Sequence, residues 1–182
     1  MILMMMANPN NIPIELEIFN SKDILHYVAV KDIFCSDIAA SLLNTEAILP
    51  ADFESFSTHV EQKNQTLPHM LVVKLGSSVV GICGVSALWA KDAHVSIYIA
   101  LTSIWQRRGL GTAITNTFTR FVEETMKPLC VVIETKPDNL AMQKTALKCG
   151  YEYMGIINNK HYDKSELYYY KYFTSYYNAI TK

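Results

Sequence analysis

The sequence predicts an α+β fold, in which helices flank a mostly antiparallel sheet. Residues 68–75 and 79–88 are rich in Val, Ile and Leu, and Gly76-Ser77-Ser78 joins them, which is typical of a β-hairpin. Residues 93–101 continue the hairpin as a meander. Residues 112–126 instead repeat apolar side chains at helical spacing, which indicates an amphipathic helix that packs on the sheet.

The remaining elements follow from the same two periodicities. Alternation of apolar and polar residues indicates strands, and apolar repeats three or four residues apart indicate helices. Asp138 is expected to cap the last helix and Gly150 to end it. In total we expect about six to seven strands and about four helices. The elements not yet named are strands at 14–19, 129–133, 151–157 and 165–173 and helices at about 22–34, 52–63 and 138–150.

The chain is expected to form one domain with a short tail. Its 182 residues are 50% hydrophobic, enough to bury a core without disulfides or metal ions. The opening Met-rich run is too short for a signal-peptide core and leads into a segment rich in Asn and Pro. We therefore assign residues 1–13 to a flexible N-terminal tail and residues 14–182 to the domain.

Charge and cysteine usage exclude several classes of function. The net charge is −1, with 16 basic and 17 acidic residues mixed along the chain, so neither nucleic acid nor an anionic membrane is an expected partner. No run approaches the ~20 apolar residues of a membrane helix. Cys35, Cys83, Cys130 and Cys149 form no Cys-x-x-Cys pair, which argues against a metal site and a disulfide framework. We expect a soluble, cytoplasmic protein with reduced thiols.

A glycine-spaced turn lies between the predicted strand at 93–101 and the helix after it. Gly109 and Gly111 can adopt backbone angles closed to other residues and let a ligand approach the main chain. The N–H groups of such a turn, at the positive end of the helix, favour phosphate oxygens. This turn is therefore a candidate binding site for a phosphorylated cofactor.

Two common nucleotide-binding motifs do not match this turn. A P-loop needs a Lys after its second glycine, and none is present here. A dinucleotide fingerprint needs a third glycine, where this chain has Ile114, and a parallel βαβ unit rather than a meander.

A third interpretation of this turn rests on its resemblance to a known family. Gln106-x-x-Gly109-x-Gly111, then Pro137-Asp138-Asn139-Leu140-Ala141, then Lys148-Cys149-Gly150-Tyr151 resembles the acetyl-CoA-binding core of the GNAT superfamily of N-acetyltransferases. The match covers about residues 70–157. The last two segments are most similar to the branch that acetylates the N-terminal amines of ribosomal proteins. The implied fold is a twisted, mostly antiparallel mixed sheet that is splayed beside the cofactor.

The resemblance also implies which residues bind acetyl-CoA. The backbone of the turn would hold the pyrophosphate, the preceding strand end would pair with the pantetheine arm, and Asn139 would contact that arm. Either Arg107 or Arg108 would meet the ribose phosphate, although a solvated loop charge is an equal alternative. Asn139 has a capping role as its alternative. The implied cofactor-binding residues are Ile99, Ala100, Leu101, Gln106, Arg107, Arg108, Gly109, Leu110, Gly111, Thr112, Asn139 and Met142.

Catalytic groups are harder to place. Many superfamily members carry a tyrosine acid where this chain has Ala146, and the ribosomal-protein branch tends to place a serine at the position of Met142. Related enzymes often hold a glutamate at the position of Ser96. We therefore name His94 and Ser96 as candidate catalytic residues.

Other groups remain alternatives. His94 and Tyr98 share one side of the strand with Ser96, although a packed histidine is the simpler reading of His94. Glu134 is another possible base, but an exposed carboxylate at a strand end is commoner. Cys149 as a covalent nucleophile is disfavoured because no base can be named beside it.

These features lead to two functional hypotheses. The first is an acetyl-CoA-dependent N-acetyltransferase that moves acetyl directly to a primary amine, either a protein N-terminus or a small-molecule amine. The second is a catalytically weak acyl-CoA-binding sensor or partner module, suggested by the missing proton donors. The acceptor is expected to enter beside residues 35–52 and the turn at 158–164. The aromatic residues at 168–173 fit a core strand with an edge or homodimer contact, because no basic groove accompanies them.

Overall fold

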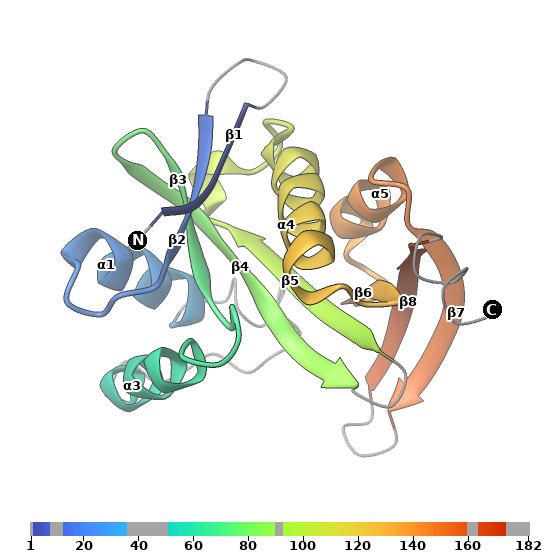
Figure 1. The fold of residues 1–182 in the computed structure, drawn as a ribbon, viewed down its shortest axis with the longest axis horizontal. Helices are drawn as coiled ribbons and strands as arrows, with labels where there is room; N and C mark the ends of the chain where they lie inside the picture. The colour runs from blue at the N-terminus through green and yellow to red at the C-terminus, as the bar shows by residue number, and fades with distance from the viewer. Residues whose placement is uncertain (1, 8–12, 36–50, 90–92, 160–163, 174–182) are drawn as a thin grey trace.

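The sheet is the frame on which the other elements are placed (Figure 1). The computed structural model describes residues 2–7, 13–35, 51–89, 93–159 and 164–173. In these residues the strands are β1 (Ile2–Ala7), β2 (Pro13–Ile18), β3 (Leu71–Leu75), β4 (Ser78–Trp89), β5 (His94–Leu101), β6 (Cys130–Thr135), β7 (Glu152–Asn159) and β8 (Lys164–Tyr172). The helices are α1 (Ile24–Phe34), α3 (Phe53–Lys63), the 3-10 turn η1 (Ser103–Trp105), α4 (Leu110–Met126) and α5 (Leu140–Lys148).

The strand order in the sheet is β1-β2-β3-β4-β5-β6-β8-β7. Every neighbouring pair is antiparallel except β5 and β6, which are parallel. The predicted α+β class with a mostly antiparallel mixed sheet is therefore confirmed. No helix among the described residues is long and apolar enough to cross a membrane.

The N-terminal segment differs from the prediction. Residues 2–7 form β1, which pairs antiparallel with β2, so the described sheet has eight strands where six to seven were expected. The open edge of β2 offers unpaired N–H and C=O groups, and an apolar run next to such an edge can satisfy them by adding a strand. Residues 2–7 thus belong to the sheet, whereas the sequence analysis assigned residues 1–13 to a tail.

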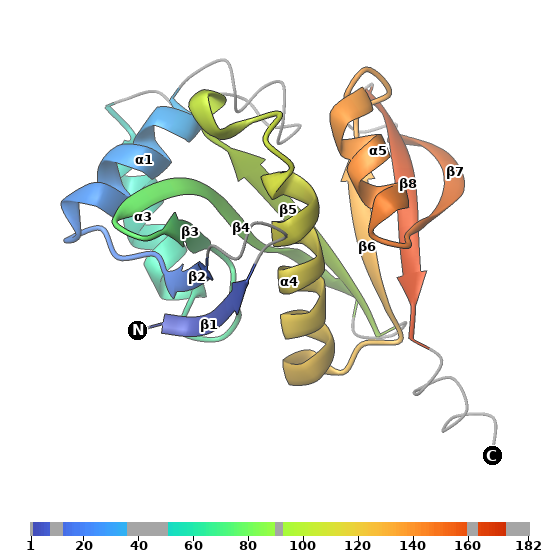
Figure 2. The same cartoon turned by 90° about the horizontal axis from the view of Figure 1, so that it is seen from above.

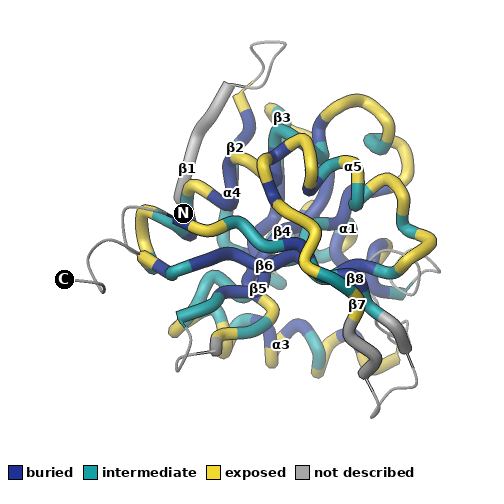
Figure 3. The backbone as a smooth tube through the Cα atoms, turned by 90° about the vertical axis from the view of Figure 1, so that its right-hand side faces the viewer, coloured by how far each residue is buried: buried dark blue, intermediate teal, exposed yellow. Residues whose placement is uncertain are grey.

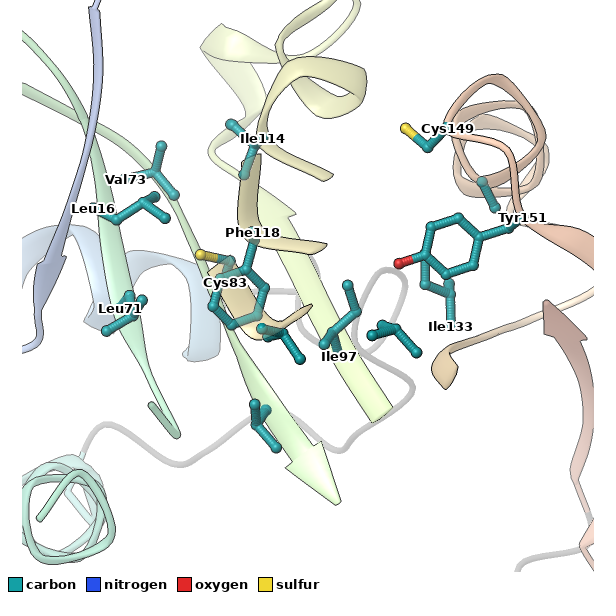
Figure 4. Packing of buried hydrophobic residues seen from close by; sticks show 14 of the residues in the cluster. Leu16, Leu71, Val73, Cys83, Ile97, Ile114, Phe118, Ile133, Cys149 and Tyr151 are labelled. Carbon is teal, nitrogen blue, oxygen red and sulfur yellow. The ribbon is translucent and has the colours of Figure 1, made fainter. Parts of the chain in front are cut away.

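Each face of the sheet carries its own hydrophobic core. On one face, Ile114 and Phe118 of α4 lie over Leu16, Leu71 and Val73 of β2 and β3 (Figure 4). On the other face, α1 and α3 pack on β3 and β4 through a second buried cluster (Figure 1). Its members are Phe19, Val30, Ile33, Phe34, Phe53, Val60, Met70, Val72, Ile82 and Ala100. The middle strands are largely buried, while the outermost strand β7 is mostly exposed where its side chains are described (Figure 3).

The parallel pair β5 and β6 is joined over only part of its length. His94 to Ile97 pair with Cys130 to Ile133, and the pairing stops there. Figure 2 shows the two strands diverging beyond this point, so that β4, β5 and α4 lie on one arm of a V and β6, β8 and α5 on the other. The last four residues of β5 therefore have no strand partner on their β6 side.

A glycine lets the chain before β3 lie directly on β4. A Cβ atom at Gly84 would lie 2.0 Å from the backbone oxygen of His69, so no side chain fits there. The approach is fixed by a hydrogen bond of 3.0 Å from Val85 N to Pro68 O and by one of 2.8 Å from the Tyr98 hydroxyl to His69 O. Residues 68–70 are thereby held over the sheet beside β5.

We predict that Gly84→Ala destabilises the protein by about 3 kcal/mol, because the new methyl group must displace backbone rather than a flexible side chain. Urea unfolding measures the free energy of unfolding. Gly111→Ala is the matched control, since its Cβ would meet nothing closer than 3.7 Å, and it should leave stability unchanged. Equal stability of the two variants would contradict this account of Gly84.

Candidate functional site

The glycine turn before α4 has the backbone geometry of an anion cradle. Arg107 and Gly109 both adopt left-handed conformations, with φ of 59° and 79°. Gly109 is the N-cap of the 17-residue helix α4, and no side chain caps the first N–H groups of that helix. These donors lie at the positive end of the helix dipole, where anions are stabilised. The turn is anchored to β5 by a 3.1 Å hydrogen bond from Gln106 Nε2 to Leu101 O.

A cleft of about 390 Å³ lies between this turn, the end of β5 and α5. Three of its side chains are cationic, namely Arg107, Lys144 and Lys148, and none is a carboxylate. The cleft therefore favours a ligand with several negative charges. Its full lining is Ile99, Ala100, Leu101, Gln106, Arg107, Gly109, Gly111, Thr112, Thr115, Asn139, Ala141, Met142, Lys144, Thr145 and Lys148.

The structure brings ten of the twelve predicted cofactor-binding residues together in this cleft, which is all of them except Arg108 and Leu110. Arg108 stacks over the Trp105 ring at 5.2 Å, and the Leu110 side chain is buried in the core below α4. Of the two arginines that the sequence left open, only Arg107 lines the cleft.

Asn139 both caps α5 and lines the cleft. Its Oδ1 accepts a hydrogen bond of 3.1 Å from Met142 N, so the predicted cap at Asp138 is wrong by one residue. The helix starts at Leu140, and the residue just before the first helical one is the N-cap. Because the cap uses the amide oxygen, the NH₂ group of Asn139 remains a donor for a ligand.

Gly150 ends α5 as predicted. It has a φ of 78°, its N–H bonds Leu147 O at 3.1 Å, and Tyr151 N bonds Ala146 O at 3.0 Å. This pair of bonds is a Schellman motif, which needs a glycine at the left-handed position. Ala146 is fully buried by this ending, so its position offers no proton donor to the cleft.

A second cavity, of about 360 Å³, lies on the opposite face of the sheet. Its floor comes from β5, β6 and β8, and its roof from α1, α3 and the chain before β3. The lining residues are Phe34, Phe56, His69, Met70, Ser86, Ser96, Ile97, Tyr98, Glu134 and Glu166. Of the described residues, two carboxylates line it and no lysine or arginine does.

Glu134 is the ionisable group of this cavity that lies nearest the parting of the strands, since it follows Ile133, the last β6 residue paired with β5. Ser96 is buried, and its Oγ donates a hydrogen bond of 3.0 Å to Glu134 Oε1. Burial raises the pKa of Glu134 above the ordinary value, the hydrogen bond from Ser96 lowers it, and the charge of Glu166 raises it. A carboxylate with a raised pKa beside a cavity can act as a base near neutral pH.

His69 lines the same cavity, and the sequence analysis did not consider it. Its Nδ1 lies 3.0 Å from the carbonyl oxygen of Val85, so Nδ1 carries the proton and Nε2 keeps a lone pair. Burial, followed by the charge of Lys63, lowers the pKa of His69 and so favours the neutral ring. No motif marks this residue, because its position depends on the close approach at Gly84.

The two catalytic candidates lie in different places. Ser96 lines the second cavity, whereas His94 lines neither cavity and instead contacts the Tyr170 ring edge-on at 5.9 Å. The structure therefore supports the interpretation of His94 as a packed histidine. The buried Cys149 thiol donates a hydrogen bond of 3.5 Å to Thr112 O, and burial raises its pKa, so it stays protonated.

The linings of the two cavities adjoin along β5. Ser96, Ile97 and Tyr98 line the second cavity, and the next three residues line the cationic cleft. The boundary between the two linings lies next to the point where β6 stops pairing with β5, after Ile97. A group held between the strands is thus accessible from both faces of the sheet. The expected acceptor entrance at 35–52 and 158–164 lies mostly outside the described residues.

Comparison with known proteins identifies the family. The family model described as acetyltransferase (GNAT) domain matches residues 19–152. The chain belongs to the GNAT acetyltransferase family. The resemblance drawn from its motifs is therefore confirmed. No curated protein sequence matches the chain significantly.

Solved GNAT structures share the fold at low sequence identity. The microcin C7 self-immunity acetyltransferase MccE, crystallised with acetyl-CoA and AMP, has a TM-score of 0.70 at 18% identity, over 88% of this chain and 92% of its own. A GNAT-family acetyltransferase from Bacillus anthracis has a TM-score of 0.72 at 15% identity, over 94% and 98%. RimL, a ribosomal L7/L12 N-terminal acetyltransferase crystallised with CoA, has 0.70 at 12%, over 87% and 93%. At these identities the likeness establishes the fold.

The residues of the GNAT cleft fit the predicted co-substrate acetyl-CoA. The phosphates of acetyl-CoA match the cationic side chains of the cleft and the uncapped N–H groups at the start of α4. A Cβ at Gly111 would find only the Thr145 Oγ1 atom, at 3.7 Å, so the glycine keeps this space free for a ligand. Thr115, which is also in the lining, is buried. Among the described residues, no group of three His, Cys, Asp or Glu side chains could hold a metal ion.

We predict that Gly111→Val weakens acetyl-CoA binding at least ~100-fold while the unfolding midpoint is kept, because the branched side chain fills the cradle and breaks several charge-assisted hydrogen bonds. Calorimetry measures the affinity. Arg108→Ala, outside the cleft, is the control and should leave the affinity unchanged. A Gly111→Val variant that binds as tightly as the parent would refute the cradle.

Proposed function

We propose that this protein is an acetyl-CoA-dependent N-acetyltransferase that moves acetyl to a primary amine. The observation that carries the proposal is that two cavities of opposite charge adjoin at the parting of β5 and β6. These are the cationic cleft beside α4 and α5 and the second cavity, here called the acidic cavity, which Glu134 and Glu166 line. The first fits a polyanionic donor, and the second fits a cationic acceptor. MccE with acetyl-CoA and RimL with CoA share the fold and support the choice of donor.

The chain binds the donor through backbone and cations. The N–H groups from Arg107 to Thr112 face the pyrophosphate, and Arg107, Lys144 and Lys148 supply positive charge. The free side of residues 98–101 pairs with the amide groups of the pantetheine arm as an added strand. These contacts lead the thioester end toward the parting of the strands, next to Glu134.

Glu134 is the proposed general base. Bound acetyl-CoA supplies an acetyl group activated as a thioester. Glu134 takes a proton from the acceptor ammonium, and the freed nitrogen forms the C–N bond to the acetyl carbon as the C–S bond breaks. The thiolate departs with the electron pair of the C–S bond and takes, through water, the second proton that the nitrogen loses on becoming an amide. Ser96 acts on Glu134 rather than on the substrate, so it is a positioning residue.

A dedicated acid is not required for this step. A thiol has a pKa of about 8.5 and an alkylammonium about 10.4, so a thiolate is a better leaving group than the amine that attacks. Met142 and Ala146, which replace the usual proton donors, are therefore compatible with turnover. Proximity of amine and thioester supplies the larger share of the rate.

A thiol-release assay tests the function directly. CoA release that depends on an added amine supports the enzyme. Tight binding of acetyl-CoA by calorimetry, without release over a broad panel of amines and peptides, would instead favour an acyl-CoA-binding module.

Glu134→Gln should lower kcat/KM by ~10²-fold or more, because the isosteric amide keeps the volume and loses the base. Acetyl-CoA affinity should stay the same, since Glu134 lines only the acidic cavity. His94→Phe serves as control and should retain activity, because an aromatic ring there keeps the contact with Tyr170. A fully active Glu134→Gln enzyme would exclude this base.

Ser96→Ala should move the acidic limb of the pH–rate profile to higher pH. The hydrogen bond from Ser96 lowers the pKa of Glu134, so its removal raises that pKa, and the base is ionised only at a higher pH. Ser86→Ala is the matched control, since Ser86 lines the same cavity. A limb that stays in place, or moves to lower pH, would contradict the assignment.

A further inference from the structure

We propose that the acceptor is a compact monoamine, a primary ammonium group on an apolar or aromatic body, rather than a peptide N-terminus. The inference deepens the proposed function and rests on it. Three properties of the acidic cavity support it: the acceptor groups that can bind an ammonium head, the apolar side chains that can contact the body of the ligand, and the volume of the cavity.

The described side chains that the head of such a ligand would meet are hydrogen-bond acceptors. Glu134 reaches the cavity from β6 and Glu166 from β8, and among the residues that the structure describes no lysine or arginine is in the lining. The two carboxylates are close enough for the charge of Glu166 to raise the pKa of Glu134. A cation between them relieves this repulsion, so an ammonium is favoured over a neutral head.

The acceptors also match the ammonium in number. A primary ammonium has three N–H donors. The cavity presents two carboxylates and Nε2 of His69, whose other nitrogen is engaged by Val85 O. The Tyr98 hydroxyl donates to His69 O at 2.8 Å, so it holds the histidine in place and does not compete as a donor. One carboxylate can therefore remove the proton while the other groups hold the head.

The rest of the cavity suits an apolar body. Phe34 of α1 and Phe56 of α3 are in ring contact, with centroids 4.8 Å apart, and Met70 completes this wall. Apolar surface of this kind stabilises a hydrocarbon or aromatic ligand by ~25 cal/mol per Å² buried. The cavity volume of about 360 Å³ lies at the small end of the range of ligand sites.

A peptide is a poorer fit to the same wall. Its backbone amides would be buried against Phe34, Phe56 and Met70, and a peptide group buried without a hydrogen bond costs ~1–3 kcal/mol. A polyamine would place its further charges against the same apolar side chains. The observations thus favour one charge and an uncharged body.

Thiol release with the 182-residue chain compares four acceptors: 2-phenylethylamine, spermidine, and hexapeptides that begin with Ser and with Ala. We expect kcat/KM for 2-phenylethylamine to exceed each of the other three at least ~30-fold. Equal or higher values for a peptide or for spermidine would overturn the inference while leaving N-acetylation intact. Release with none of the four, despite acetyl-CoA binding, would count against the proposed function itself.

A charge variant tests how the head is bound. Glu166→Gln should raise KM for 2-phenylethylamine at least ~10-fold with kcat little changed, because Glu166 attracts the cation and does not take the proton. Glu152→Gln, which removes an exposed carboxylate of β7 outside the cavity, is the matched control. Unchanged KM in Glu166→Gln, or an equal rise in the control, would refute recognition of the ammonium by Glu166.

Discussion

The end of pairing between β5 and β6 is the constraint on which the site depends. Up to Ile97 and Ile133 the two strands exchange backbone hydrogen bonds, and beyond them β5 runs on alone for four residues on that side. Unpaired backbone groups in a buried setting cost ~1–3 kcal/mol each unless a partner arrives. The Gln106 side chain donates one hydrogen bond, to Leu101 O, and the other backbone groups on this side of residues 98–101 remain for a ligand. The break lies in the middle of the sheet, and the linings of the two cavities adjoin beside it.

The two faces differ in charge, and this gives the reaction a direction. Arg107, Lys144 and Lys148 line the cleft on the α4 and α5 face, while Glu134 and Glu166 line the cavity on the α1 and α3 face. Opposite charges on the two sides of one gap keep a polyanion and a cation in separate compartments. The linings of the two cavities adjoin along β5, where Tyr98 lines one and Ile99 the other.

The features of the fold and the site that could be predicted from the sequence are those set by residues close together in the chain. The turn at Gly109 and the ending at Gly150 are local, because a positive φ and a helix boundary are encoded within a few residues, and both were identified. The cap was misplaced from Asn139 to Asp138, since neighbouring capping residues are hard to rank without the helix start. Strand β1 was missed because it depends on an open edge at β2.

Catalytic groups depend on contacts that the sequence does not display. Strand periodicity places His94 and Ser96 on one side of β5, yet their surroundings differ. The two residues lie ~7 Å apart along the strand, and Ser96 lines a cavity while His94 packs against Tyr170. The sequence favours an exposed strand-end carboxylate at Glu134, whereas in the structure Glu134 lies beside the parting of the strands, where burial raises its pKa and supports its proposed role as the base. His69 enters because Gly84 lets a distant segment lie on the sheet.

Long-range packing therefore supplies the acceptor side, and a local motif supplies the donor side. The local motif requires few residues, so it can be recognised in a chain that shares 12% to 18% identity with solved relatives of the same fold. The acceptor cavity draws on α1, α3, β4, β5, β6, β8 and the chain before β3, so a change in any one of these elements alters it. Acceptor preference can thus diverge while the cradle stays the same. For this reason the chemistry of the cavity's own lining is a better guide to the acceptor than the preferences of a relative.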